Sequence, residues 1–154
     1  MNMSTIWLFL HLSSVTVWVG GMFFAYMCLR PVAAAQLDTP LRLKLWLGVF
    51  SRFFPWVWLC VGLLLASGLA MLLAVGMKSA PLHWHLMFGI GLVMMLIFLH
   101  VFFAPYRRLG RAVDASDWAA GAAALGAIRR LVGTNTLLGL ANIAMATIGR
   151  LLVG

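Results

Sequence analysis

The sequence predicts an all-α integral membrane protein built as a bundle of four transmembrane helices. Of the 154 residues, 64% are hydrophobic and only 9% are charged. The mean hydropathy of +1.05 lies outside the usual balance of a soluble domain. Four apolar stretches reach the roughly 20 residues that a helix needs to cross about 30 Å of hydrocarbon. They are too long and too continuous for the alternating strands of a membrane β-barrel.

The four helices are expected to form a single transmembrane domain, residues 1–154. The predicted spans cover residues 5–29, 53–77, 82–104 and 131–153. The first span ends at Arg30-Pro31, and Pro105 follows the third. The first span is too long, and the residues before it are too poor in basic side chains, for a cleaved signal peptide.

One amphipathic segment connects the two spans within each half of the chain. Residues 40–54 mix basic side chains with aromatic and aliphatic ones, which predicts a helix lying at the membrane interface. Residues 114–130 are rich in alanine and end in two arginines, which predicts a second short helix with Ser116 as its N-cap.

The distribution of lysine and arginine predicts the orientation. Most of the basic residues lie in the two connecting segments: Arg30, Arg42, Lys44, Arg52, Arg107, Arg108, Arg111, Arg129 and Arg130. Both segments should therefore face the cytoplasm, with both termini in the periplasm of a bacterial inner membrane. The net charge of +8 is then a topology signal and a contact for anionic lipids of the bilayer. Nucleic-acid binding is not expected.

The two halves of the chain resemble a duplication. His11 precedes Pro31 by 20 residues, and His85 precedes Pro105 by 20 residues. Both halves run in the same direction across the membrane, which predicts two parallel-repeat helical hairpins related by an axis along the membrane normal. Such an axis would bring His11 and His85 to equivalent depths.

A histidine within hydrocarbon is costly and by default indicates a functional site. We expect His11 and His85 to be the two axial ligands of a b-type haem held between facing helices. Trp18 follows His11 on its helix, and glycines such as Gly21 and Gly89 would make room for the macrocycle. The protein would then transfer electrons, with a quinone or a periplasmic redox protein as its partner. The alternative is that each imidazole only hydrogen-bonds a backbone carbonyl or an interfacial water.

His100 is expected to lie outside this site. It follows His85 by 15 residues, which places it roughly 22 Å further along the helix. It is predicted to be an interfacial histidine or a proton-carrying group near Arg30.

The first and third spans resemble known membrane proteins. The residues that carry the resemblance are Leu10-His11, Trp18-Val19-Gly20-Gly21, Arg30-Pro31, His85 and His100. Together they resemble the CopD-type copper resistance membrane proteins and, more distantly, the HemJ-type protoporphyrinogen oxidases. The resemblance implies a four-helix haem or copper protein of the inner membrane, with His11 matching the first-helix haem ligand of the oxidase-like group. The lysine of those oxidases near the start of the third helix is missing, so protoporphyrinogen oxidase activity is not expected, although another membrane oxidoreductase activity is compatible.

Copper binding or transport across the inner membrane is the alternative function. The chain has ten methionines and two cysteines, and His83-Trp84-His85 stands at the outer end of the third span. Thioether and imidazole groups suit copper, and His83 is an alternative ligand to His85. Scattered methionines also serve as ordinary core filler. A periplasmic copper protein would be the partner in this case. A third interpretation is a structural subunit without a cofactor, and a homo-oligomer is compatible with all three.

Overall fold

The computed structural model describes residues 3–152, with side chains described for residues 3–149, and the chain is helical nearly throughout. Its elements are α1 (Met3–Phe24), the π-helical turn η1 (Ala25–Leu29), α2 (Arg30–Gln36), α3 (Thr39–Val75), α4 (Leu82–Phe103), α5 (Pro105–Asp114) and α6 (Trp118–Leu152). No strand occurs within residues 3–152.

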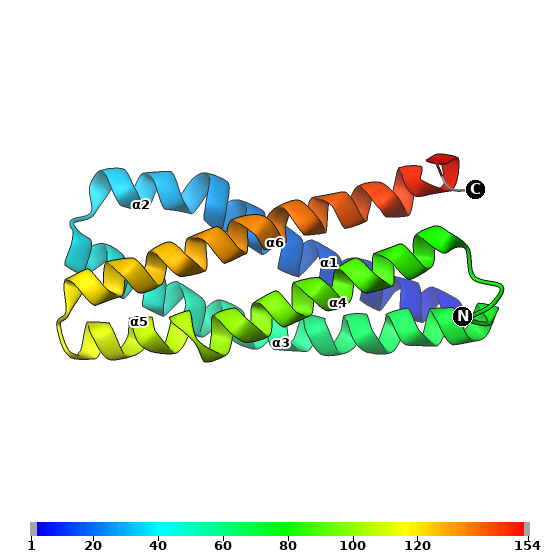
Figure 1. Ribbon diagram of the computed structural model, residues 1–154, viewed down its shortest axis with the longest axis horizontal. Coiled ribbons are helices and arrows are strands. Elements are labelled where there is room, and N and C mark those ends of the chain that lie inside the picture. The colour runs from blue at the N-terminus through cyan, green and yellow to red at the C-terminus, as the bar shows by residue number, and fades with distance from the viewer. Residues whose placement is uncertain (1–2, 153–154) are drawn as a thin grey trace.

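The helices lie along the long axis of an elongated bundle (Figure 1). Four continuous helical stretches are long and apolar enough to cross a membrane: Met3–Gln36, Thr39–Val75, Leu82–Asp114 and Trp118–Gly149. The prediction of four spans is therefore confirmed. Each stretch extends beyond the bounds expected from hydropathy at the end where the connecting segments lie, since these segments are helical too.

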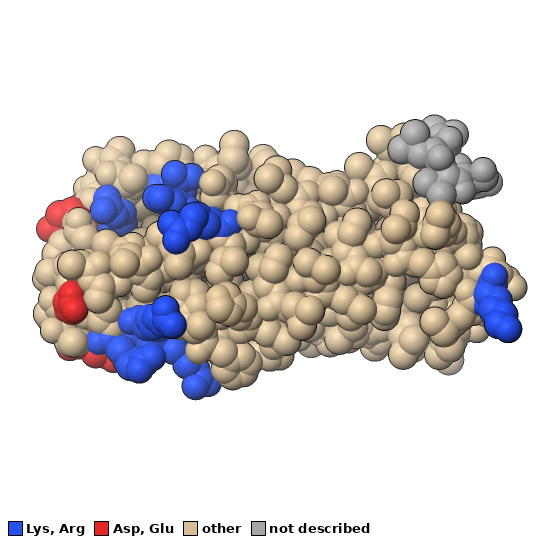
Figure 2. All heavy atoms as spheres, in the orientation of Figure 1, with Lys and Arg blue, Asp and Glu red and all other residues tan. Residues whose placement is uncertain are grey.

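The two ends of the bundle differ in charge. The α2–α3 and α5–α6 connections lie at one end, whereas the α3–α4 connection and both termini lie at the other (Figure 1). On the face that Figure 2 shows, lysine and arginine side chains gather toward the first of these ends, and the middle of the bundle carries neither. We call this the basic end. We call the opposite end, near His11, His83 and His85, the histidine end.

The helices pair as two hairpins around an aromatic core. α1 packs along α3, and α4 packs along α6, with α5 also against α6. Phe98 of α4 joins the two pairs, because its ring centroid lies 6.2 Å from that of Trp18 on α1 and 5.6 Å from that of Phe54 on α3. Both contacts are edge-to-face, the arrangement that aromatic rings prefer.

Residues 40–54 do not form a separate interfacial helix, so this prediction is wrong. They are the first half of α3, which Asp38 caps by accepting a hydrogen bond from the backbone N–H of Leu41 at 3.0 Å. The inward side chains of this half are buried: Leu43, Trp46 and Phe50. The amphipathic pattern therefore reflects packing against the bundle and not against a membrane surface.

The start of α6 also differs from the prediction. Ser116 is not the N-cap, because it has a φ of 54° and lies in the turn before the helix. The side chain of Asp117 is the cap, since it accepts a hydrogen bond from the backbone N–H of Ala120 at 3.0 Å. The helix then continues into the last span, and the short helix of this connection is α5, which precedes it.

The first span contains one wide turn, η1. Here the backbone N–H of Arg30 bonds to the carbonyl of Ala25, five residues back. Pro31 follows directly, and a proline has no N–H to bond four residues back and crowds the preceding turn with its ring. The proline thus accounts for the wider turn. Such π-turns within helices are often found at functional sites.

Candidate functional site

His11 of α1 is held by a hydrogen bond to α3. Its Nδ1 lies 2.9 Å from the hydroxyl oxygen of Ser67. The Ser67 hydroxyl has a single proton, which it donates to the carbonyl of Leu63 at 2.6 Å. This arrangement favours Ser67 as the acceptor of the bond from His11, and so favours the neutral tautomer with its proton on Nδ1. This leaves the Nε2 lone pair of His11 without a proton, which is the state that binds a metal.

His11 lies beside Gly68 of α3 and near α4. A Cβ atom at Gly68 would be in ordinary van der Waals contact with His11 Cε1, at 3.8 Å, and with the ring of Phe88 on α4, at 3.9 Å. His11 and Phe88 therefore lie close to the same point of α3. The imidazole is half-buried between α1 and α3, close to α4.

His83 and His85 lie on different sides of α4. His83 is only 8% exposed, and its Cβ packs beside Gly149 of α6, next to Met145. Its Nδ1 is buried and has no hydrogen-bond partner within the described part of the chain. His85 is half-buried and is rotated by about 200° from His83. The sequence argument favoured His85, whereas the structure places His83 toward the interior.

The other residues predicted around a haem have three different environments. Trp18 is buried in the aromatic core. Gly21 is covered by the ring of Phe53, which a side chain at this position would strike. Gly89 is exposed, and no atom lies within 4 Å of the place where its Cβ would be.

His100 lies at the other end of the bundle. It is exposed and belongs to the last turn of α4, at the basic end. It is therefore far from His11, as its spacing in the sequence indicated.

Two asparagines of α6 face α4 within the fourth candidate membrane span. Asn135 donates its amide N–H to the carbonyl of Met94 at 3.3 Å, and Asn142 donates to the carbonyl of Met87 at 3.2 Å. The amide oxygens of both are buried and have no partner among the described residues. The sequence argument missed both residues. The sequence pattern that could have identified them is a pair of strongly polar side chains, seven residues apart on one apolar helix. This spacing places both on one face of the helix.

Two methionine side chains lie near Asn135. The amide nitrogen of Asn135 lies 3.7 Å from the Sδ atom of Met22 on α1. A side chain at Gly139, one turn further along α6, would meet the methyl group of Met94 at 3.2 Å. Met22 and Met94 are both buried, as is Met95. Thioethers of two helices therefore lie in the core near Asn135, where α1, α4 and α6 meet.

The described side chains include few clustered histidine, cysteine or carboxylate groups, which are the ligands of most protein-bound metals. Among them, no group of three or more histidine, cysteine, aspartate or glutamate residues comes together. Cys60 is buried in α3, and Cys28 is exposed. A metal bound within this bundle would therefore depend on thioether and imidazole donors, which suit copper.

Comparison with known proteins identifies one family. The family model described as CopD, copper resistance protein D, matches residues 47–148. The match covers about two thirds of the chain and includes Ser67, both His83 and His85, and Asn135, whereas His11 lies outside it. No curated protein and no solved structure matches the chain.

Proposed function

The chain belongs to the copper resistance protein D family of membrane proteins, and from this premise we propose that it binds copper within the bilayer and carries it across the bacterial inner membrane. In this proposal the histidine end faces the periplasm, where a copper protein would deliver the ion, and the basic end faces the cytoplasm. The charge difference between the two ends supports this orientation.

The observation that carries the proposal is the state of His11. Its hydrogen bond to Ser67 favours the tautomer with the proton on Nδ1, in which Nε2 would be available to a metal ion. A hydrogen-bonding partner that orients the ligand in this way is typical of metal-binding histidines.

The side chains further in support a route for the ion. At the histidine end, the buried Nδ1 atom of His83 has no hydrogen-bond partner among the described residues, and the side chains of His83 and Met145 both lie against Gly149. Met22 and Met94 lie deeper, near Asn135. Imidazole followed by thioether suits copper(I), a soft ion. These ligands are neutral and few, so they would bind the ion weakly enough to release it, as transport requires.

We further propose that the two hairpins, α1 with α3 and α4 with α6, are parallel repeats related by an axis along the membrane normal. The closer packing within each pair than between pairs supports this arrangement. The first-hairpin histidine His11 and the second-hairpin histidines would then lie at similar depths and accept the same ion.

A b-type haem between His11 and His85 is the second proposal, and it has less support. Both imidazoles would have to face one space large enough for the macrocycle. Phe88 lies next to His11 instead, and the gap at Gly21 is filled by Phe53. The electron partners of such a haem would be a quinone or a periplasmic redox protein.

One measurement separates the two proposals. The full chain, purified in detergent, is analysed for bound metal after exposure to copper(I), and its absorption spectrum is recorded. We expect bound copper and no Soret band. A Soret band at stoichiometric haem, without copper, would replace the copper proposal with the haem proposal. Neither group bound would leave a structural subunit and overturn both.

A further inference from the structure

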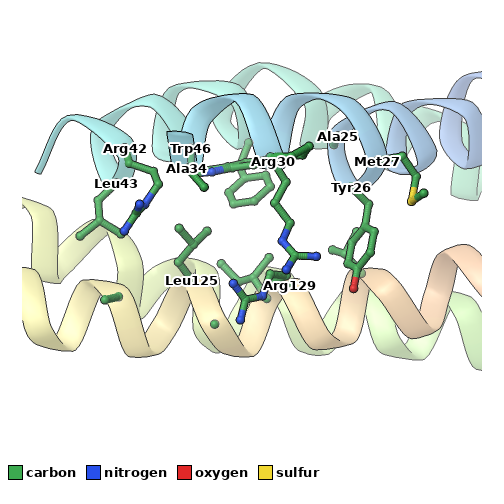
Figure 3. A pocket seen from close by; sticks show the side chains of 16 residues that line it. Ala25, Tyr26, Met27, Arg30, Ala34, Arg42, Leu43, Trp46, Leu125 and Arg129 are labelled. Atoms are coloured by element: carbon green, nitrogen blue, oxygen red, sulfur yellow. The ribbon is translucent and has the colours of Figure 1, made fainter. Parts of the chain in front are cut away.

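The basic end contains a pocket that the copper proposal does not use. It has a volume of about 630 Å³ and lies between the η1–α2 segment, α3 and α6. Arginines from all three of these walls line it: Arg30, Arg42 and Arg129. Figure 3 shows the side chains of Arg30 and Arg129 extending from opposite walls into the same space.

Helix register places Arg30 and Arg129 at the same level. A side chain at Gly133 of α6 would meet the ring of Tyr26 at 2.9 Å, so these two positions are opposite each other. The first span and α6 run in opposite directions. Arg30 follows Tyr26 by four residues, and Arg129 precedes Gly133 by four residues. Both arginines therefore lie about 6 Å nearer the basic end than the Tyr26–Gly133 contact does.

The three guanidinium groups have no carboxylate to neutralise them. The whole chain has only three acidic residues. Two of these, Asp38 and Asp117, accept backbone hydrogen bonds at the starts of α3 and α6. Within residues 3–149, no side-chain hydrogen bond joins an arginine of the pocket to a carboxylate.

The contacts that these arginines do make leave their charge intact. Arg30 lies over the ring of Tyr26, with 4.9 Å between its Cζ atom and the ring centroid. Arg42 donates to the hydroxyl of Thr39 at 3.4 Å. Like charges that point into one space repel each other unless an anion lies between them. The pocket is therefore complementary to a negatively charged group.

The rest of the lining is apolar. The side chains around and beyond the guanidinium groups include Ala25, Met27, Ala34, Leu125 and Val132. Met27 is exposed on the surface of the first span, which places this side of the pocket in contact with lipid. The wide turn η1 supplies Ala25, Tyr26 and Met27 to the same wall. An irregular turn caused by Pro31 thus shapes the pocket.

From this arrangement we propose that the pocket binds an anionic phospholipid of the leaflet at the basic end. Its phosphate would be held between Arg30 and Arg129, with Arg42 toward the aqueous side. A guanidinium binds phosphate oxygens in a bidentate manner. One acyl chain would lie against the apolar wall. A free phosphate ion would satisfy the arginines and leave that wall unfilled, so a lipid fits the whole pocket better.

The test is native mass spectrometry of the full chain in detergent with added phosphatidylglycerol. Phosphatidylethanolamine with the same acyl chains and inorganic phosphate serve as the comparison ligands. We expect phosphatidylglycerol to bind more tightly than either. In the double variant Arg30→Gln with Arg129→Gln, its affinity should fall roughly tenfold or more, from the loss of two charge-assisted hydrogen-bonding groups.

The matched control is Arg52→Gln with Arg130→Gln, which removes the same charge from exposed positions outside the pocket. This control should bind phosphatidylglycerol like the wild type. Equal losses in both double variants would mean that only net charge matters and would overturn the proposal. Inorganic phosphate that binds as tightly as the lipid would overturn the lipid assignment. If the glutamine pair does not fold, Arg30→Lys with Arg129→Lys keeps the charge, and it should still weaken binding through the loss of bidentate contacts.

Discussion

At the scale of single residues, the proposed copper site depends on a hydrogen bond between positions 56 residues apart in the chain. Ser67 fixes the proton of His11 because its own hydroxyl proton is already used within α3. His11 could be found from the sequence, since a histidine in an apolar span is unusual. Ser67 could not, because a serine in a membrane helix normally bonds its own backbone, as Ser67 also does.

Removing His11 and removing Ser67 should both weaken copper binding, but by different amounts. His11→Ala removes a ligand, whereas Ser67→Ala removes only the group that orients it. We expect the affinity for copper(I) to fall about 10- to 100-fold in Ser67→Ala, as for other residues that support a metal ligand, and further in His11→Ala. Competition with a chelator of known affinity measures both.

His100→Ala is the control for this pair, because His100 is exposed at the basic end. Its affinity should equal that of the wild type. An unchanged affinity in His11→Ala, with thermal unfolding also unchanged, would remove His11 from the copper site.

At the scale of helices, close packing depends on where glycines meet bulky neighbours. Gly20 and Gly21 are adjacent in α1, but only Gly21 faces a neighbouring ring, that of Phe53 on α3. The sequence shows both glycines and predicts close approach of helices. It does not tell which of the two is covered, because this depends on the rotation of α1 against α3.

The two glycines therefore make a matched pair of variants. Gly21→Ala should destabilise the protein by about 1–3 kcal/mol, because the new methyl group displaces Phe53 from a packed site. Gly20→Ala should be neutral or stabilising by up to about 1 kcal/mol, since alanine favours a helix over glycine. Thermal unfolding in detergent compares them. A Gly20→Ala protein less stable than Gly21→Ala would mean that the rotation of α1 is wrong.

At the scale of the whole molecule, two helices are longer than a membrane is thick. α3 has 37 residues and is therefore about 55 Å long, compared with about 30 Å of hydrocarbon. α6 has 35 residues. Relative to the spans predicted from hydropathy, the excess lies at the basic end, where α2 and α5 also lie and extend the bundle. Hydropathy predicted the four spans and missed this extension, since its buried side chains are interleaved with basic ones.

The topology follows from the same distribution of charge. Reporter fusions made after Arg111 should behave as cytoplasmic, and fusions made after Gly154 should behave as periplasmic, because the basic connections remain inside. Activity of a cytoplasmic reporter at Gly154 would reverse the orientation and place the histidines at the inner face.

How much could be predicted from sequence depends on the range of the interactions. The spans and the charged end follow from local composition and are confirmed. The contacts within the bundle do not, since Asn135 bonds the backbone of Met94, 41 residues away. The same holds for the choice between His83 and His85, which depends on the rotation of α4. The arginine pocket likewise combines residues of three elements. Each arginine taken alone indicates only which end of a span faces the cytoplasm.

The most direct test of copper transport is the uptake of copper(I) into vesicles that contain the purified protein. Uptake should exceed that of protein-free vesicles. It should fall about tenfold or more in Met22→Leu with Met94→Leu, a change that conserves volume and removes the thioethers. Met77→Leu, at an exposed position outside both proposed sites, is the control and should transport like the wild type. Uptake by the wild type no faster than by protein-free vesicles would contradict the account.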